Sequence, residues 1–134
     1  MEAVPSRRPP ERRFFIQFLQ YWLPVLLYVT LIIVLSSQAN LQPPFHWNNG
    51  DKLAHMMEYF GLGILLARAW RSALRLRWAL AAAMIALAMG VLVGAGDEFY
   101  QSFVPGRDSS VYDLMADTIG VALAQVAYLV FAKD

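Results

Sequence analysis

The segment FFIQFLQYWLPVLLYVTLIIVL, residues 14–35, decides the fold, because it runs without a single charged side chain. At a helical rise of about 1.5 Å per residue it matches the roughly 30 Å hydrocarbon core of a bilayer. Arginines precede it, and Ser37-Gln38-Ala39 faintly resembles a signal-peptidase site. The run is longer than the apolar part of an ordinary signal peptide. We therefore expect an uncleaved first membrane-spanning helix.

Three more apolar stretches follow, at residues 53–67, 78–96 and 112–132. The stretch 53–67 contains His55 and Glu58, so it spans only if its outer turns tolerate those polar groups. With 58% hydrophobic and 16% charged residues, the chain has more apolar surface than one small soluble core could bury. The sequence predicts an all-α polytopic membrane protein, a bundle of four transmembrane helices, with residues 1–13 as a basic tail and 14–134 as one domain.

Small residues are frequent in the third stretch, where Gly90 and Gly94 are separated by one helical turn. This spacing lets membrane helices approach closely. We expect the stretch 78–96 to lie inside the bundle and the glycines to pack within one chain rather than at a dimer interface. The sequence leaves the oligomeric state open.

The basic residues lie on one side of such a bundle. Nine of the eleven fall in the amino-terminal segment, the connection between the second and third stretches, and the carboxyl terminus. The positive-inside rule then places both termini in the cytoplasm and the two Pro-containing loops outside. The other side carries seven of the ten acidic residues against only Lys52 and Arg107. Clustered carboxylates are costly at low dielectric, so part of this charge needs neutralisation.

Polar residues at helical spacing form the candidate outer site. Polar stripes lie at the start of the stretch 53–67, at the end of the stretch 78–96 and at the start of the stretch 112–132. A basic residue, Arg107, lies in the loop between the last two stretches. In chain order the candidates are Asp51, Lys52, His55, Glu58, Tyr59, Asp97, Glu98, Gln101, Arg107, Asp113 and Asp117. Ionisable groups at membrane depth usually mark a functional site or an internal ion pair.

Structural roles compete with functional ones at each position. Asn49 or Asp51 is a possible cap of the second helix, and Ser110 with Asp113 matches a capping box. A lone histidine on an apolar helix is more often structural than a ligand or base, and a tyrosine there is more often packing. Acidic residues at a helix carboxyl end oppose its dipole. Asp97 and Glu98 are therefore expected to pair with Arg107 or Lys52.

Two motifs resemble one family. They are Asp51-Lys52-x-x-His55-x-x-x-Tyr59-x-x-Leu62-Gly63 and Asp97-Glu98-x-x-Gln101-x-Phe103-Val104-Pro105-Gly106-Arg107-x-x-Ser110-x-x-Asp113. With this spacing and hydropathy the chain resembles the VanZ-like family, over residues 51–124. The resemblance implies a bacterial four-helix protein of the plasma (inner) membrane and cell envelope, in a family named for a member linked to resistance to the glycopeptide teicoplanin. One departure is Asp117, where the family pattern has asparagine.

The leading functional hypothesis is an outward-facing polar pocket that binds or modulates an envelope amphiphile, such as a lipid or cell-wall precursor headgroup. A contribution to glycopeptide tolerance is part of that hypothesis. For the pocket, an anionic headgroup, a cationic headgroup and a bridging divalent ion stay open as ligands. The alternative is an intramembrane metal- or acid/base-dependent enzyme acting on such a headgroup. Both hypotheses allow a divalent cation, with Asp51, His55 and Glu98 as candidate ligands. The sequence has no cysteine, no HExxH, no serine elbow and no nucleic-acid signature, and we lean against catalysis.

Overall fold

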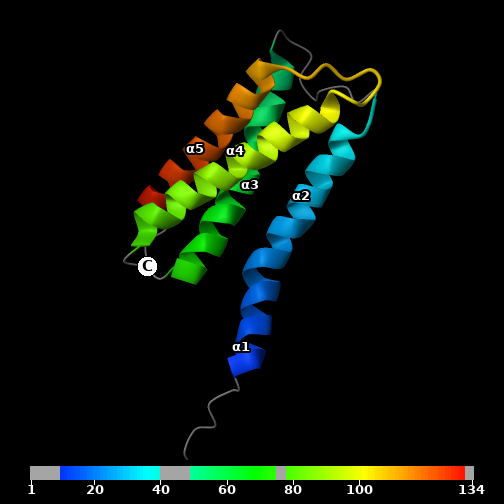
Figure 1. Ribbon diagram of the computed structural model, residues 1–134. Coiled ribbons are helices and arrows are strands. Elements are labelled where there is room, and N and C mark those ends of the chain that lie inside the picture. The colour runs from blue at the N-terminus through cyan, green and yellow to red at the C-terminus, as the bar shows by residue number, and fades with distance from the viewer. Residues whose placement is uncertain (1–9, 40–48, 75–77, 132–134) are drawn as a thin grey trace, which may run out of the picture.

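A computed structural model describes residues 10–39, 49–74 and 78–131. Its elements are α1 (Pro10–Gln17), a π-helical segment η1 (Phe18–Trp22), α2 (Leu23–Ser36), α3 (Gly50–Leu74), α4 (Ala79–Gln101) and α5 (Val111–Phe131). The segments α1, η1 and α2 follow one another as a single long helix, so the described residues form four long helices and no strand (Figure 1). The predicted all-α class is confirmed.

The first helix changes its hydrogen-bonding pattern before Pro24. The Leu23 amide donates to the Phe18 carbonyl, five residues earlier, instead of to the fourth. Proline has no N–H and its ring crowds the preceding turn, and a wider π turn accommodates both effects. The helix therefore continues past Pro24, and it begins at Pro10, before the predicted start at Phe14.

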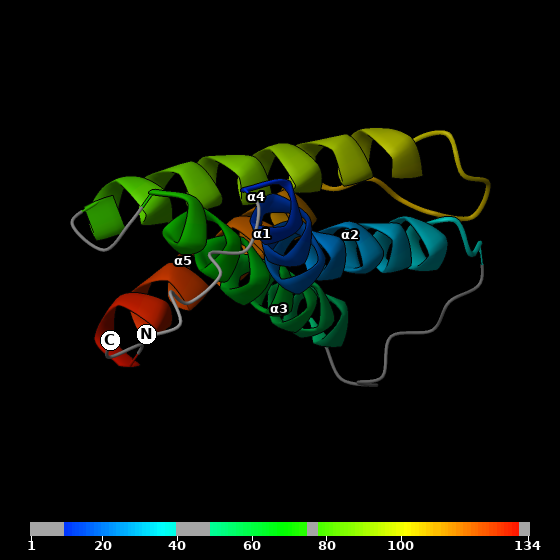
Figure 2. The ribbon, with the colours of Figure 1, turned by 90° about the horizontal axis from the view of Figure 1, so that it is seen from below.

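The helix α3 is the central element. It contacts α2, α4 and α5, and the core side chains Tyr59, Leu62 and Leu66 all belong to it. Figure 2 shows the bundle from below, with α4 along its upper edge and α2, α3 and α5 below α4 in the view. We expected this inner place for residues 78–96, but α4 exposes large side chains such as Leu80 and Leu92. A helix covered by protein needs less apolar character than one facing lipid, which is why α3 tolerates polar residues.

Within the described residues, three helices are long and apolar enough to cross a membrane, namely Glu11–Ser36, Ala79–Gln101 and Val111–Phe131. Their outer surfaces carry many exposed large hydrophobic side chains, including Leu27, Leu92 and Phe131. Water-soluble monomers rarely expose apolar area on this scale. The structure thus supports a membrane protein, and α3, with 25 residues, lies beside the three apolar helices.

Glycines set the close helix crossings. A Cβ at Gly90 would meet Val121 at 2.7 Å, and one at Gly94 would meet Asp117 at 3.3 Å. Both glycines thus pack against α5 of the same chain, as the small-residue spacing predicted. A Cβ at Gly120 would collide with the Met56 carbonyl oxygen of α3. The crossing of α3 and α5 therefore depends on glycine.

Candidate functional site

The candidate residues meet where four helix ends come together. The end of α2, the start of α3, the end of α4 and the start of α5 lie at the same end of the bundle (Figure 1). The loop 102–110, which contains Arg107, crosses this end. The antiparallel order of the helices thus brings together three stripes that are up to 62 positions apart in the sequence.

Lys52 joins α3 to α5 through two carboxylates. Its ammonium donates to Asp51 Oδ2 at 2.6 Å and to Asp113 Oδ1. Asp113 is buried, whereas Asp51 is about half exposed. Lys52 therefore forms its ion pairs with Asp51 and Asp113. The predicted pairing of this lysine with Asp97 or Glu98 is wrong.

Gln101 is a buried junction between α2, α4 and the loop. Its Nε2 donates to Asp97 Oδ2 at 2.9 Å and to Ser36 Oγ at 3.3 Å. Its Oε1 accepts from Arg107 Nη2 at 3.0 Å and Nε at 3.3 Å. Arg107 thus reaches Asp97 only through a neutral amide, and among the described residues it forms no ion pair. The predicted direct pairing of Arg107 with Asp97 or Glu98 is also wrong.

Glu98 replaces one half of the predicted capping box. In such a box the Asp113 carboxylate would accept from the Ser110 amide. Here Glu98 Oε2 accepts from that amide at 2.8 Å, and Asp113 accepts from Lys52. Ser110 Oγ still caps α5, by accepting from the Tyr112 amide at 3.2 Å. The exchange ties the end of α4 to the start of α5.

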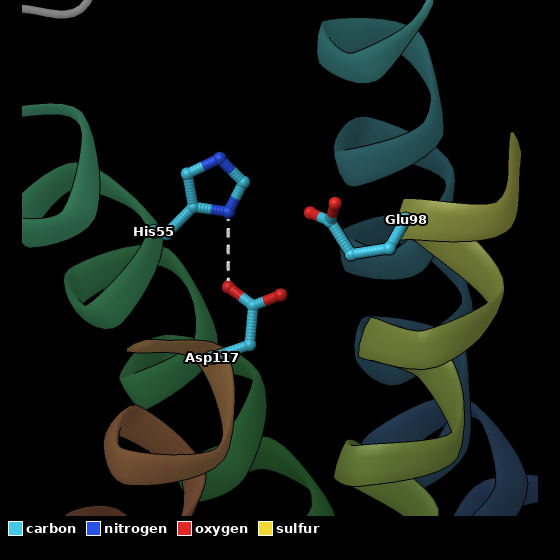
Figure 3. A group of neighbouring side chains, drawn as sticks. All are labelled: His55, Glu98 and Asp117. Atoms are coloured by element: carbon cyan, nitrogen blue, oxygen red, sulfur yellow. Dashed lines mark hydrogen bonds and ion pairs between the residues drawn. The ribbon is translucent and has the colours of Figure 1, made fainter. Parts of the chain in front are cut away.

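His55 and Asp117 face each other across α3 and α5. His55 Nδ1 lies 3.0 Å from Asp117 Oδ1, and the Glu98 carboxylate points toward this pair from α4 (Figure 3). One ligand atom from each of the three residues lies within 4.8 Å of the others. Asp51, a predicted metal candidate, is not in this group because it pairs with Lys52. Its place is taken by Asp117.

Several buried oxygens near this group have no hydrogen-bond partner among the described residues. They are Tyr59 OH, Asp97 Oδ1, Glu98 Oε1 and Asp117 Oδ2. Tyr59 and Asp117 are fully buried, and Asp97 and Glu98 are 6% exposed. Unpaired buried carboxylate oxygens are uncommon, because each costs the free energy of its lost hydration. A bound ligand that contacts these oxygens, or protonation of one of the carboxylates, would remove this cost.

A cavity of about 530 Å³ opens beside the group. His55, Glu58, Gln101 and Arg107 contribute polar side chains to its lining, and α2 contributes the apolar side chains Leu31 and Leu35. Further lining residues are Tyr28, Ser36, Ala39, Asp51, Ala54, Gly106, Asp108 and Asp113. The volume is in the range of small-molecule sites.

The contribution of α2 was missed in the sequence. Ser36 bonds to Gln101, and the Tyr28 hydroxyl donates to the Glu58 carbonyl oxygen at 3.0 Å. Neither residue belongs to a charged stripe. Their only signal was that each is a polar group in an otherwise apolar span, a position where buried hydroxyls generally find a partner.

Comparison with known proteins places the chain in a family. A family model described as VanZ/LLP1 matches residues 13–132. The chain is also 28% identical, over 109 residues, to the uncharacterized protein C11E3.10 of the fission yeast Schizosaccharomyces pombe. That match covers 81% of this chain and 65% of the yeast protein, so the chain spans less than two thirds of this relative. No solved structure matches. Since the family model covers nearly all of the sequence, including every candidate residue, the chain belongs to the VanZ/LLP1 family.

Proposed function

We propose that the protein binds a membrane amphiphile, with the headgroup in the cavity beside His55 and an acyl chain along α2. The observation that carries this proposal is the mixed lining of the cavity. Arg107 and several carboxylates line it together with the apolar side chains Leu31 and Leu35 of α2. An amphiphile likewise combines polar and apolar parts in one molecule.

The charges favour a headgroup that carries both signs. Arg107 offers a planar guanidinium suited to a phosphate, and its described hydrogen bonds go to a neutral amide. Asp51, Glu58, Asp108 and Asp113 line the same cavity and would repel a purely anionic group. A phosphate joined to an ammonium group satisfies both sides. The proposed ligand class is therefore an aminophospholipid.

The yeast relative bears on the choice between lipid and cell-wall precursor. Its presence shows that similar sequences occur outside bacteria. Yeasts build no peptidoglycan, whereas aminophospholipids are common to both kinds of cell. This comparison favours a lipid headgroup. Any contribution to glycopeptide tolerance would then follow from altered lipid at the envelope surface.

A second candidate function is hydrolysis or transfer at such a headgroup. The observation in its favour is the buried pair of His55 and Asp117, since an aspartate beside a histidine can hold the imidazole in one tautomer. In the binding proposal, His55 instead forms part of the cavity wall, and Asp117 holds its ring from behind. Release of a product from a bound lipid by the purified protein would establish the catalytic alternative.

Arg107→Lys tests the binding proposal. Lysine keeps the charge but loses the bidentate fork, and a hydrogen bond between charged groups contributes about 1.5–3 kcal/mol. We expect affinity for phosphatidylethanolamine, measured by native mass spectrometry in detergent, to fall about tenfold or more. Arg68→Lys, at an arginine that lies 5.8 Å from the Tyr21 ring and outside the cavity, is the matched control. Equal binding of phosphatidylglycerol and phosphatidylethanolamine by the unmutated protein would argue against the ammonium subsite.

We further propose that α3 crosses the bilayer with the other three helices, in a plasma membrane, with the cavity outside and both termini in the cytoplasm. The distribution of basic residues supports this orientation. Because the chain has no cysteine, single-cysteine variants report cleanly on sidedness. Ser109→Cys should react with a membrane-impermeant maleimide in intact cells, and Ala73→Cys only after permeabilisation. The reverse pattern would overturn the orientation.

A further inference from the structure

We propose that His55, Glu98 and Asp117 form a binding site for one divalent transition-metal ion of the Zn²⁺ or Mn²⁺ class. The three side chains come from three helices, α3, α4 and α5, and their ligand atoms lie within 4.8 Å of one another. One imidazole and two carboxylates are the donors that such ions accept, whereas Mg²⁺ and Ca²⁺ prefer oxygen alone. This inference does not depend on lipid binding.

The short contact between His55 and Asp117 fits two ligands of one ion. His55 Nδ1 and Asp117 Oδ1 are 3.0 Å apart. Two donors each about 2.0–2.2 Å from a tetrahedral ion lie about 3.3–3.6 Å apart, so the two side chains need to separate by only a few tenths of an ångström. Glu98 stands across from the pair and needs a small side-chain movement to complete the group (Figure 3).

The unpaired oxygens supply an independent reason. Asp117 Oδ2 and Glu98 Oε1 are buried without a hydrogen-bond partner among the described residues. The Tyr59 hydroxyl is likewise fully buried and without a hydrogen-bond partner among the described residues. A metal ion would satisfy the carboxylates directly, and a water on the ion would reach groups behind them.

The nearby cations do not neutralise this cluster. Lys52 pairs with Asp51 and Asp113, and Arg107 donates to Gln101. Buried carboxylates without a cation are costly, and a divalent ion offsets two of them at once. The cavity that reaches His55 provides an entry path from the polar end of the bundle.

The test uses the full chain in detergent, stripped with a chelator and then titrated with Zn²⁺ alone. We expect about one ion per chain by elemental analysis and a rise in melting temperature, because an ion that binds only the folded state stabilises it. His55→Gln, Glu98→Gln and Asp117→Asn should each weaken binding by at least about 100-fold, since loss of even an outer-shell group typically costs 10–100-fold. Glu11→Gln, at an exposed carboxylate in α1 outside the cavity, is the matched control.

A second measurement covers variants that fold poorly. Co²⁺ bound in place of Zn²⁺ should give visible absorption characteristic of a nitrogen and oxygen site, and Glu98→Asp should shift that spectrum while keeping the charge. Binding of Zn²⁺ that survives all three ligand substitutions, or the absence of any bound Zn²⁺ or Mn²⁺ in the folded unmutated protein, would overturn the site. Neither result would touch lipid binding, which is measured separately with Arg107→Lys.

Discussion

Replacing Gly120 with alanine is expected to lower the free energy of unfolding by about 2–3 kcal/mol, at the upper end of the usual cost of overpacking. The new methyl group would collide with the Met56 carbonyl oxygen and lie 3.0 Å from the Phe60 amide nitrogen. Both atoms belong to the backbone of α3, so no side chain can move aside. The helices α3 and α5 would have to separate, and α5 carries Asp113 and Asp117. Chemical or thermal unfolding in detergent measures the loss.

Gly96→Ala is the matched control for this change. It is the same substitution in a membrane helix, but a Cβ at Gly96 meets no atom within 4 Å. Alanine is the better helix former by about 0.8–1.0 kcal/mol in soluble hosts, so this variant should be unchanged or slightly more stable. Equal stability of the two variants would mean that α3 and α5 do not cross as closely as described.

Gln101→Leu is expected to cost about 2–4 kcal/mol of stability and to loosen α2 from the bundle. Each buried polar group left without a partner costs about 1–3 kcal/mol. This change strips hydrogen bonds from Asp97, Ser36 and Arg107 at once. Gln101 is only 2% exposed, so water cannot replace them readily. Unfolding in detergent gives the magnitude, and protease sensitivity of the loop 102–110 reports the local loosening.

Gln125→Leu separates this network effect from the loss of any buried amide. Gln125 is also buried, but its Nε2 donates to backbone oxygens, to Gly63 at 3.0 Å and more weakly to Val121, and its Oε1 has no partner among the described residues. We expect a cost of about 1 kcal/mol there. If Gln125→Leu destabilises the protein as much as Gln101→Leu, Gln101 is not the junction described above.

The apolar helices were predictable because lipid imposes a simple rule, a long uncharged stretch for each crossing. Residues 14–35 and 78–96 follow that rule, and residues 112–132 follow it beyond Asp113 and Asp117 in their first two turns. Their helices differ from the predictions mainly at the ends. The helix α3 departs from it. Its neighbours, not lipid, cover its polar stripe, and the sequence does not state which helix will be central. For this reason the sequence predicts too short a helix, residues 53–67 instead of Gly50–Leu74, and it predicts the inner position for residues 78–96 instead.

Within the candidate site, the spacing along the sequence predicted which residues share one end of the bundle. It did not predict which side chains form ion pairs or hydrogen bonds with each other. Lys52 and Arg107 were expected to neutralise Asp97 and Glu98, yet the first pairs with Asp113 and the second with Gln101. Pairing depends on side-chain reach and on how each helix is rotated, and periodicity along one helix does not contain that information. The sequence does not predict the role of Ser36 for the same reason, because that role depends on the position of Gln101 in the folded bundle.

The most direct test of headgroup binding in the cavity is to fill the cavity. Ala54 lines it on α3, and Ala54→Trp would occupy space that the headgroup needs. Ala95→Trp places the same ring on the exposed surface of α4, outside the cavity. The measurement is native mass spectrometry of phospholipid retained on protein extracted directly from its membrane. We predict one tightly held aminophospholipid on the unmutated protein and on Ala95→Trp, and its loss from a folded Ala54→Trp; equal retention by both variants would contradict the account.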